Sequence, residues 1–135
     1  MRHLQSPQEA YRRVDFDARV SVSSPADLVH LCVEQLVGAV GSAIYAFETH
    51  DNALKSRSLT RALASVTALQ IGVTGDGPMA MALHQMYEAA RRTLLDSATD
   101  FDSNRMANLR RDFVDIGQSL KNASSNSSIS ADNSN

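Results

Sequence analysis

Apolar residues recur every three or four positions along most of the chain, which is the spacing of α-helices buried on one face. Four segments share this pattern. Their apolar positions, in chain order, are Leu28, Leu31, Cys32, Leu36, Ala39, Val40, Ala43 and Phe47, then Leu54, Leu59, Ala62, Leu63, Val66 and Leu69, then Met79, Leu83, Met86, Tyr87, Ala90, Leu94 and Ala98, and finally Met106, Leu109, Phe113, Ile116 and Leu120. The pattern predicts four amphipathic helices joined by short connections.

Helix-start signals and breaks mark the ends of these segments. Ser24-Pro25-Ala26-Asp27 is typical of an N-cap followed by proline in the first turn. The apolar spacing breaks at Asp51-Asn52 and restarts behind it, and the last helix is predicted to begin near Asp102-Ser103. The first segment also contains Gly38 and Gly41, and each costs about 1 kcal/mol relative to alanine inside a helix. Close helix packing is the favoured explanation, and room for a ligand is the alternative.

The stretch Gly72–Pro78, "GVTGDGP", lies between the second and third segments. A phosphate-binding loop would need a strand before it and, in the P-loop, Gly-Lys-Ser/Thr after it. Neither is present. The stretch is therefore predicted to be a turn, in which glycine ends one helix, Asp76 or Gly77 caps the next, and Pro78 occupies its first turn.

The two ends of the chain differ from the helical pattern. Ser6-Pro7-Gln8-Glu9 reads as a capping box and predicts a short helix carrying Tyr11. Residues 14–22 alternate apolar and polar without any second strand-like segment to pair with, so residues 1–23 are expected to form an extended or partly helical arm. Residues 122–135 are a polar, low-complexity tail predicted to be disordered. The predicted fold is all-α: an antiparallel up-and-down four-helix bundle at residues 24–121, with the N-terminal arm packed on it.

Composition and charge narrow the function mainly by exclusion. The chain is 43% hydrophobic and has a formal net charge of −2, and without a strong basic patch we expect no nucleic acid as partner. Its single cysteine, Cys32, excludes an intramolecular disulfide or a multi-cysteine metal site. No uncharged apolar run of about eighteen residues and no signal-peptide core is found, so we expect no membrane insertion and a cytoplasmic protein.

No constellation of catalytic or metal-binding residues can be assembled from the sequence. The four histidines form no HExxH motif, the Glu-x-x-His pair of di-iron bundles is absent, and no serine lies in a nucleophile elbow. His30 and His84 lie on predicted helices, which raises the hypothesis of a histidine phosphotransfer bundle, but neither is followed by the lysine such domains carry. We therefore predict that the protein is not an enzyme and holds neither cofactor nor metal.

Three sequence stretches, in order and at matching spacing, resemble one known family. "SSPADLVHLCVEQL" is similar to the opening of the first long helix of FliS, the flagellin export chaperone family, "KSRSLTRAL" looks like its second-helix segment, and "GDGPMAMALHQMYEAARRTLLDS" resembles its Gly-Gly-x-x-Ala-x-x-Leu-x-x-Leu-Tyr-x-Tyr segment. Tyr87 is the matching tyrosine. The chain departs from the family at Val33-Glu34-Gln35, which replaces Tyr-Asp-Gly, at Asp76-Gly77, at Ala89, and in having no tryptophan.

The resemblance implies a cytoplasmic chaperone that binds the disordered C-terminal segment of flagellin, prevents its premature polymerisation and supports its secretion. Components of the flagellar export apparatus are further candidate partners. Such a segment is amphipathic and helix-prone, and grooves between helices can receive it. The alternative is a generic helical protein-interaction or regulatory module.

The residues expected to contact the client come from the wide apolar arc of the first long helix. Its apolar positions cover too large an angle to face a single core, and the third helix shares this property. The candidate client-binding residues are Tyr11, Val29, Val33, Val37, Val40, Ile44 and Tyr87. The arm bearing Tyr11 is expected to cover part of this surface when no client is bound. Four methionines, Met79, Met81, Met86 and Met106, suit either an adaptable surface or the core, and core packing is favoured.

Overall fold

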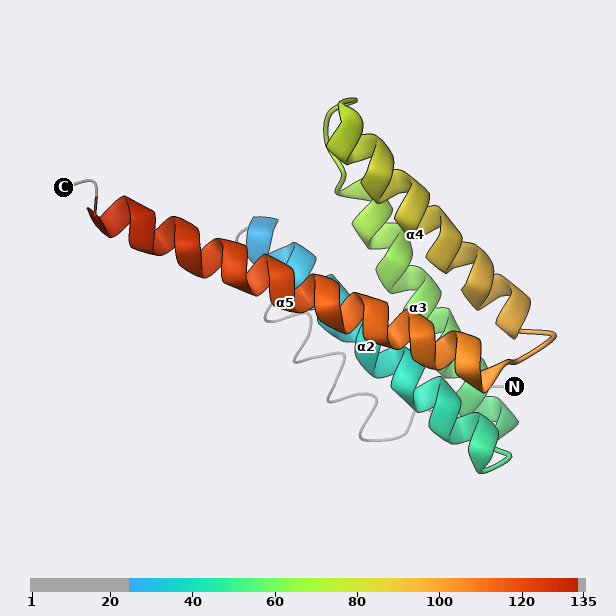
Figure 1. Cartoon of the computed structure of the whole chain (residues 1–135). Helices are drawn as coiled ribbons and strands as arrows, with labels where there is room; N and C mark the ends of the chain where they lie inside the picture. Colours follow the sequence, from blue (N-terminus) through green and yellow to red (C-terminus); the bar gives the residue numbers. More distant parts are fainter. Residues whose placement is uncertain (1–24, 134–135) are drawn as a thin grey trace, which may run out of the picture.

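A computed structural model describes the backbone of residues 25–133 and the side chains of residues 26–122. It contains four helices, α2 (Pro25–Glu48), α3 (Asn52–Ile71), α4 (Pro78–Ser97) and α5 (Ser103–Asn133), and no strand among the described residues (Figure 1). The helix-rich fold class predicted from the apolar spacing is confirmed. The predicted N-terminal arm, residues 1–23 with its short helix and Tyr11, lies outside the described residues.

The core lies between α2 and its two neighbours. α2 packs most extensively against α3 and then against α5, while α4 packs on α3. The buried apolar residues are Leu31, Val33, Leu36, Ala39, Val40, Ala43 and Ala46 of α2, Leu59, Ala62, Val66 and Leu69 of α3, Ala80, Tyr87, Ala90 and Leu94 of α4, and Met106, Leu109 and Phe113 of α5. Most of them belong to the three-four pattern read from the sequence, because that spacing places them on one face of each helix, and the exceptions are Val33, Ala46 and Ala80.

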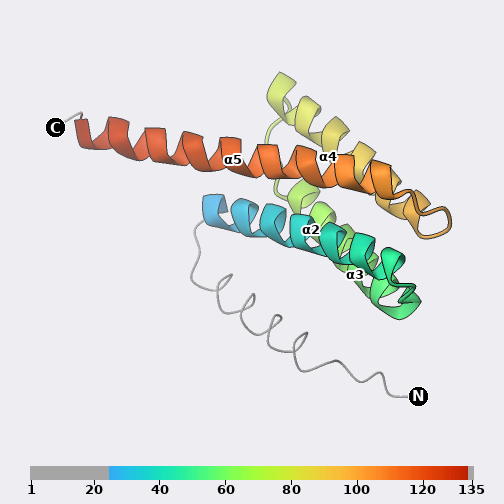
Figure 2. The same cartoon turned by 60° about the horizontal axis from the view of Figure 1, so that its bottom comes forward.

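Within residues 25–133, the fourth side of the bundle is left open. α4 and α5 are consecutive and joined by a short connection, yet they have fewer contacts with each other than any other neighbouring pair. They meet near that connection and diverge away from it, as two views of the molecule show (Figures 1 and 2). The sequence predicts an up-and-down bundle, and the structure adds that its α4–α5 side is splayed.

The helix ends follow the signals in the sequence. Asp51 caps α3 by accepting a hydrogen bond from the Leu54 amide at 3.0 Å, and Asp102 Oδ1 accepts from the amides of Asn104 at 2.9 Å and Arg105 at 3.2 Å. These side-chain oxygens satisfy amides that have no partner within the first turn of a helix. Between α2 and α3, His50 adopts the left-handed conformation with φ of 59°.

Gly72–Pro78 is the turn that the sequence predicts. α3 ends at Ile71, Gly77 is the N-cap of α4 in extended conformation, and Pro78 opens that helix. The positive φ that requires glycine lies at Gly75, at 84°, in the middle of the turn, whereas Gly72 at the end of α3 keeps right-handed angles. No phosphate-binding geometry of strand, loop and helix exists here.

Helix α2 has the length and the apolar composition of a membrane-spanning helix. Among the described residues, Ala26–Glu48 is the one stretch long and apolar enough to cross a bilayer by length and composition alone. In the folded chain this helix supplies five core residues with no exposed surface, Leu36, Ala39, Val40, Ala43 and Ala46. The core of the bundle therefore accounts for part of its apolar composition, since 33% of its most apolar stretch is buried.

Helix α5 is longer than the sequence pattern predicts. The last bundle helix is expected to end near residue 121, before the Ser/Asn-rich tail, but the α5 backbone continues to Asn133. Extending a helix that is already formed fixes one residue per hydrogen bond and avoids the nucleation cost, so a polar stretch can continue it without tertiary packing. Apolar periodicity reports where a helix packs and does not report where its backbone stops.

Candidate functional site

An apolar groove of about 500 Å³ lies between α4 and α5, where the two helices diverge. Its lining comes from one face of each helix: Met86, Ala89, Ala90 and Thr93 from α4, and Arg105, Asn108, Leu109, Asp112, Phe113, Asp115 and Ile116 from α5. On α5 the lining extends over eleven residue steps, or about 16 Å of helix at 1.5 Å per residue. That length matches about three turns of a further helix.

Two aromatic rings support the floor of the groove. Tyr87 and Phe113 lie with ring centroids 6.2 Å apart and planes 23° from parallel, and they are only 4% and 2% exposed. Ala90 lines the same groove and is 3% exposed. The groove therefore has a preformed apolar base that belongs to the core.

The end of the groove near the α4–α5 connection is closed by contacts between the two helices. Met106 Sδ lies 3.1 Å from the buried Ser97 hydroxyl, which donates a 2.7 Å hydrogen bond to the Thr93 carbonyl of its own helix. Arg105 Nη2 reaches across from α5 and donates to Thr93 Oγ1 at 3.5 Å. The contacts hold α4 and α5 together at this end, while the other end is open.

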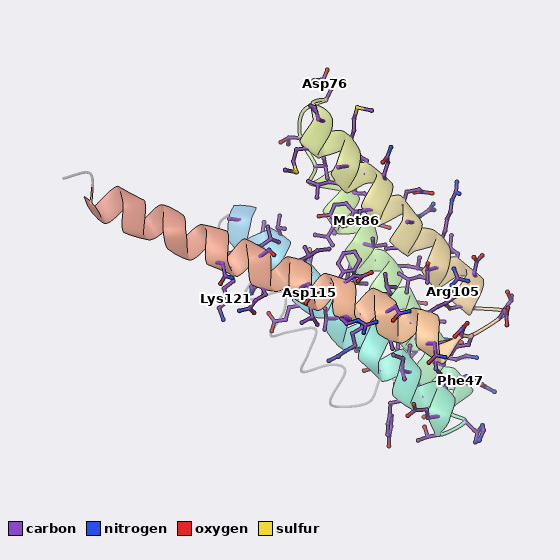
Figure 3. The ribbon with its side chains drawn as sticks, in the orientation of Figure 1. Phe47, Asp76, Met86, Arg105, Asp115 and Lys121 are labelled. Atoms are coloured by element: carbon purple, nitrogen blue, oxygen red, sulfur yellow. The ribbon has the colours of Figure 1, made fainter. Side chains whose placement is uncertain are left out.

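The rim of the groove is polar, and its charges are arranged along α5. Figure 3 shows Arg105 near the closed end, with Met86 and Asp115 further along. Asp112 and Asp115 are exposed and form no ion pair with another described side chain. Asn108, between the two ends, accepts a hydrogen bond from Arg111. An apolar floor with a polar rim is typical of a surface that receives an amphipathic partner.

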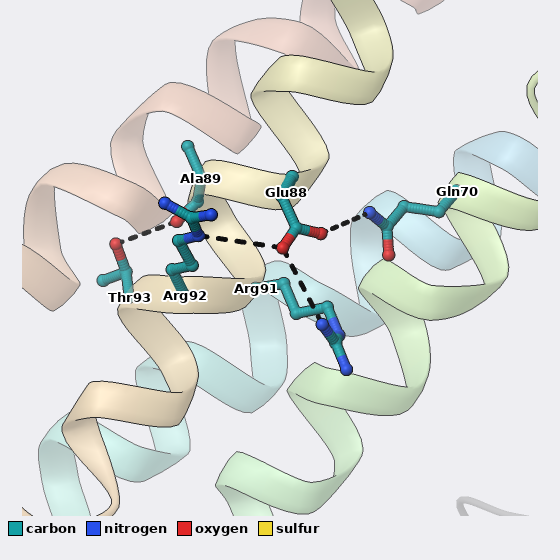
Figure 4. A network of polar contacts seen from close by, with 6 residues as sticks. All are labelled: Gln70, Glu88, Ala89, Arg91, Arg92 and Thr93. Carbon is teal, nitrogen blue, oxygen red and sulfur yellow. Dashed lines mark hydrogen bonds and ion pairs between the residues drawn. The ribbon is translucent and has the colours of Figure 1, made fainter.

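The opposite side of α4 is fixed to α3 by a polar network. Glu88 Oε2 accepts from Gln70 Nε2 of α3 at 3.2 Å, and Glu88 Oε1 lies 3.8 Å from both Arg91 and Arg92 (Figure 4). Ion pairs this exposed contribute little to stability, so the network fixes the orientation of α4 more than it strengthens the fold. Glu88 and Arg92 are four residues apart and so lie on the same face of α4.

Two titratable groups near the core have raised pKa values. Burial raises the pKa of the Cys32 thiol from its ordinary value of 9.0. The pKa of Tyr87 is raised from 10.0 first by burial and second by the neighbouring Cys32, whose thiolate would repel a phenolate. Both groups are therefore neutral near pH 7 and act as part of the apolar interior.

Metal-ligating side chains are dispersed over the described part of the chain. No group of three or more His, Cys, Asp or Glu side chains in this part of the chain could hold a metal ion. His84 is exposed and His30 is partly buried, on separate helices. What the groove offers a partner is apolar surface with charged edges.

Of the client-binding residues predicted from the sequence, Tyr11 lies outside the described residues, and the others are not in the lining of the α4–α5 groove. Val33 and Val40 are core residues at 3% and 0% exposure. Val29, Val37 and Ile44 are partly buried beside that core, so they form an interrupted apolar stripe along α2.

Tyr87 does not line the groove itself, but its ring stacks on Phe113, which does. The methionines divide in the same way: Met106 is buried, Met86 lines the groove, and Met79 and Met81 are 74% and 58% exposed.

The groove residues of α5 were missed because their apolar members read as ordinary core positions. One signal was available on α4, whose apolar arc is too wide for a single core. That signal does not identify the groove residues by itself, because Ala89 and Asp112 have the spacing of solvent-facing positions, and only the divergence of α5 from α4 brings them into one groove.

Comparison with known families gives one finding. The family model described as flagellar protein FliS matches residues 7–126, which covers most of the chain and all of the groove. Comparison with curated proteins gives no match. The helical bundle, its open apolar groove and the family match agree, and the chain belongs to the FliS family of flagellar secretion chaperones.

Proposed function

We propose that this protein binds the C-terminal segment of flagellin in the cytoplasm, keeps it from polymerising before secretion, and presents it to the flagellar export apparatus. Family membership supports the general role of a flagellar export chaperone with flagellin as its client. The observation that carries the more specific proposal is the open α4–α5 groove.

The dimensions of the groove suit a helix-forming segment. A bundle whose neighbouring helices α4 and α5 diverge leaves apolar side chains at the position that a further helix would cover. An amphipathic segment can place anchors at i, i+3, i+4 and i+7 against Met86, Leu109 and Ile116, with its polar face toward solvent. A flagellin terminus bound in this way would have its apolar face covered by the groove, and that face would no longer be free for polymerisation.

The stripe of α2 is a second surface for the same client. Val29, Val37 and Ile44 retain exposed apolar surface in the described structure. A disordered segment that folds on binding commonly wraps a large area, and about 1,000 to 3,000 Å² is typical, which exceeds what one groove of three turns offers. We therefore retain these α2 residues as proposed contacts for a flanking part of the segment.

Calorimetric titration with the isolated C-terminal segment of flagellin tests the proposal. Saturable binding with a negative change in heat capacity is expected, because apolar surface is buried. Ala89→Glu should abolish or strongly weaken binding, since it places a charged side chain in the groove at an exposed helical position where it leaves the fold intact.

The matched control is Ala107→Glu, which introduces the same side chain at an exposed position of α5 outside the groove and should bind as wild type. Val37→Asp reports on the α2 stripe, and Val40→Asp is unsuitable because Val40 is fully buried. If a folded wild-type protein failed to bind the segment, or if the two glutamate variants bound alike, the α4–α5 groove would not be the client site.

A further inference from the structure

The two ends of the α4–α5 groove carry opposite charge. Asp112 and Asp115 lie toward the open end, and Arg105 lies at the closed end. Ten residue steps separate Arg105 from Asp115 along α5, or about 15 Å. Figure 3 shows these two residues well separated along the helix, with Met86 of α4 facing the same region.

A helix of the length of the groove has complementary ends. Its first turn presents unpaired amides and a partial positive charge, and its last turn presents unpaired carbonyls and a partial negative charge. Carboxylates stabilise the first, and a guanidinium stabilises the second. The two aspartates form no ion pair with other described side chains. The Arg105 guanidinium donates one long hydrogen bond to Thr93, at 3.5 Å, which binding of a client helix could replace.

We propose that the groove fixes the direction in which the helical part of its client lies: N-terminal turn at Asp112 and Asp115, C-terminal turn at Arg105. The bound helix then runs parallel to α4 and antiparallel to α5. This inference rests on the proposed function, and it adds a polarity that apolar contacts alone do not set, because an amphipathic face can be presented in either direction.

The chain contains its own probes of direction. Met81 lies near the start of α4 at the open end, Met86 lines the groove, and Met106 lies at the closed end beside Ser97. Methyl spectra of the methionine-labelled, full-length protein are recorded with the shortest flagellin C-terminal peptide that shifts the Met86 signal. The peptide carries a nitroxide spin label at either its N-terminal or its C-terminal end.

The expected result is stronger broadening of Met81 than of Met106 by the N-terminal label, and the reverse by the C-terminal label. The opposite pattern, or equal broadening of both methyls by each label, would overturn the proposed direction while leaving groove binding intact. A peptide that binds without shifting Met86 would place the site elsewhere, and would remove both the groove assignment and the direction.

Charge variants provide a second test. A charge near a helix end changes affinity by roughly two- to five-fold, so Asp112→Asn and Asp115→Asn should each weaken binding by about that factor, and Arg105→Gln likewise. Asp96→Asn is the matched control, because it removes the same charge from an exposed position of α4 outside the groove, and it should bind as wild type. If the combined Asp112 and Asp115 variant bound as tightly as the Asp96 variant, the aspartates would have no role in orienting the client.

Discussion

Two helical glycines with different surroundings test how closely α2 and α5 pack. A Cβ atom added at Gly38 of α2 would have no other heavy atom within 4 Å, whereas one added at Gly117 of α5 would lie 3.2 Å from Val33 Cγ1. Ordinary van der Waals contact begins near 3.4 Å. Gly38→Ala and Gly117→Ala therefore make the same chemical change in open space and in a tight contact.

The difference between the two variants isolates the cost of the contact. Each alanine gains about 1 kcal/mol in helix propensity, so Gly38→Ala should stabilise the protein by about that amount. Val33 is 3% exposed and β-branched, so its methyl group cannot rotate away and α5 must move from α2. Overpacking of this kind costs about 1 to 3 kcal/mol, so Gly117→Ala should be neutral or destabilising by up to about 2 kcal/mol.

Urea unfolding followed by circular dichroism measures both free energies of unfolding. The slope of the transition should not change, since the surface exposed on unfolding is the same, and the midpoints should move apart. Gly41→Ala is an internal control: its added Cβ meets only the Arg110 side chain, 3.3 Å away at Nε, which can move aside, so it should behave more like Gly38→Ala. Equal stabilisation at Gly38 and Gly117 would refute the tight α2–α5 contact.

Three further predictions concern stability. His50→Gly should raise the free energy of unfolding by about 0.5 to 1 kcal/mol in urea titrations, because glycine adopts the φ of 59° without the Cβ penalty. A lower free energy of unfolding would show that contacts of the histidine side chain outweigh the backbone strain. Phe101→Ala should lower the free energy of unfolding by about 1 to 2.5 kcal/mol. It removes the ring whose centroid lies 4.6 Å from that of Phe47, and the cation–π contact with the Lys55 ammonium 5.7 Å away. An unchanged thermal midpoint would contradict this. The free energy of unfolding should fall as pH rises above about 9, because folding raises the pKa of the Cys32 thiol and the folded state then holds more protons than the unfolded state. Cys32→Ala should remove the first part of that fall and leave the part due to Tyr87. An identical pH profile for the variant would argue against this reasoning.

The sequence predicts the helices better than their arrangement. Three-residue and four-residue spacing located α2 to α5, and the break at Asp51-Asn52 and the start near Asp102-Ser103 agree with the observed beginnings of α3 and α5, because such signals act over a few residues. The explanation of the glycines by close helix packing does not hold at Gly38, which faces open space, and at Gly41 the neighbour is the flexible Arg110 side chain.

The opening between α4 and α5 could not be predicted in this way. It depends on how far two helices diverge beyond their contacts at Met106 and Ser97, which is a long-range property of the whole bundle. Periodicity likewise cannot separate Val33 and Val40, which are buried, from Val37, which is partly exposed on the same α2 stripe. The client-binding set of α2 therefore stays a prediction, and the groove residues emerged only from the structure.

The open side of the bundle has a consequence for how much of this protein is folded in the cell. Because α4 and α5 diverge from their contact at Ser97 and Met106, the described residues leave uncovered part of the apolar surface that would stabilise a closed bundle. Whatever fills the groove binds the native state alone and adds RT ln(1 + [L]/Kd) to its stability, about 2.7 kcal/mol at a hundredfold excess over Kd. The lifetime of the chain against proteolysis should then rise and fall with the supply of its partner, so that unused copies are removed first.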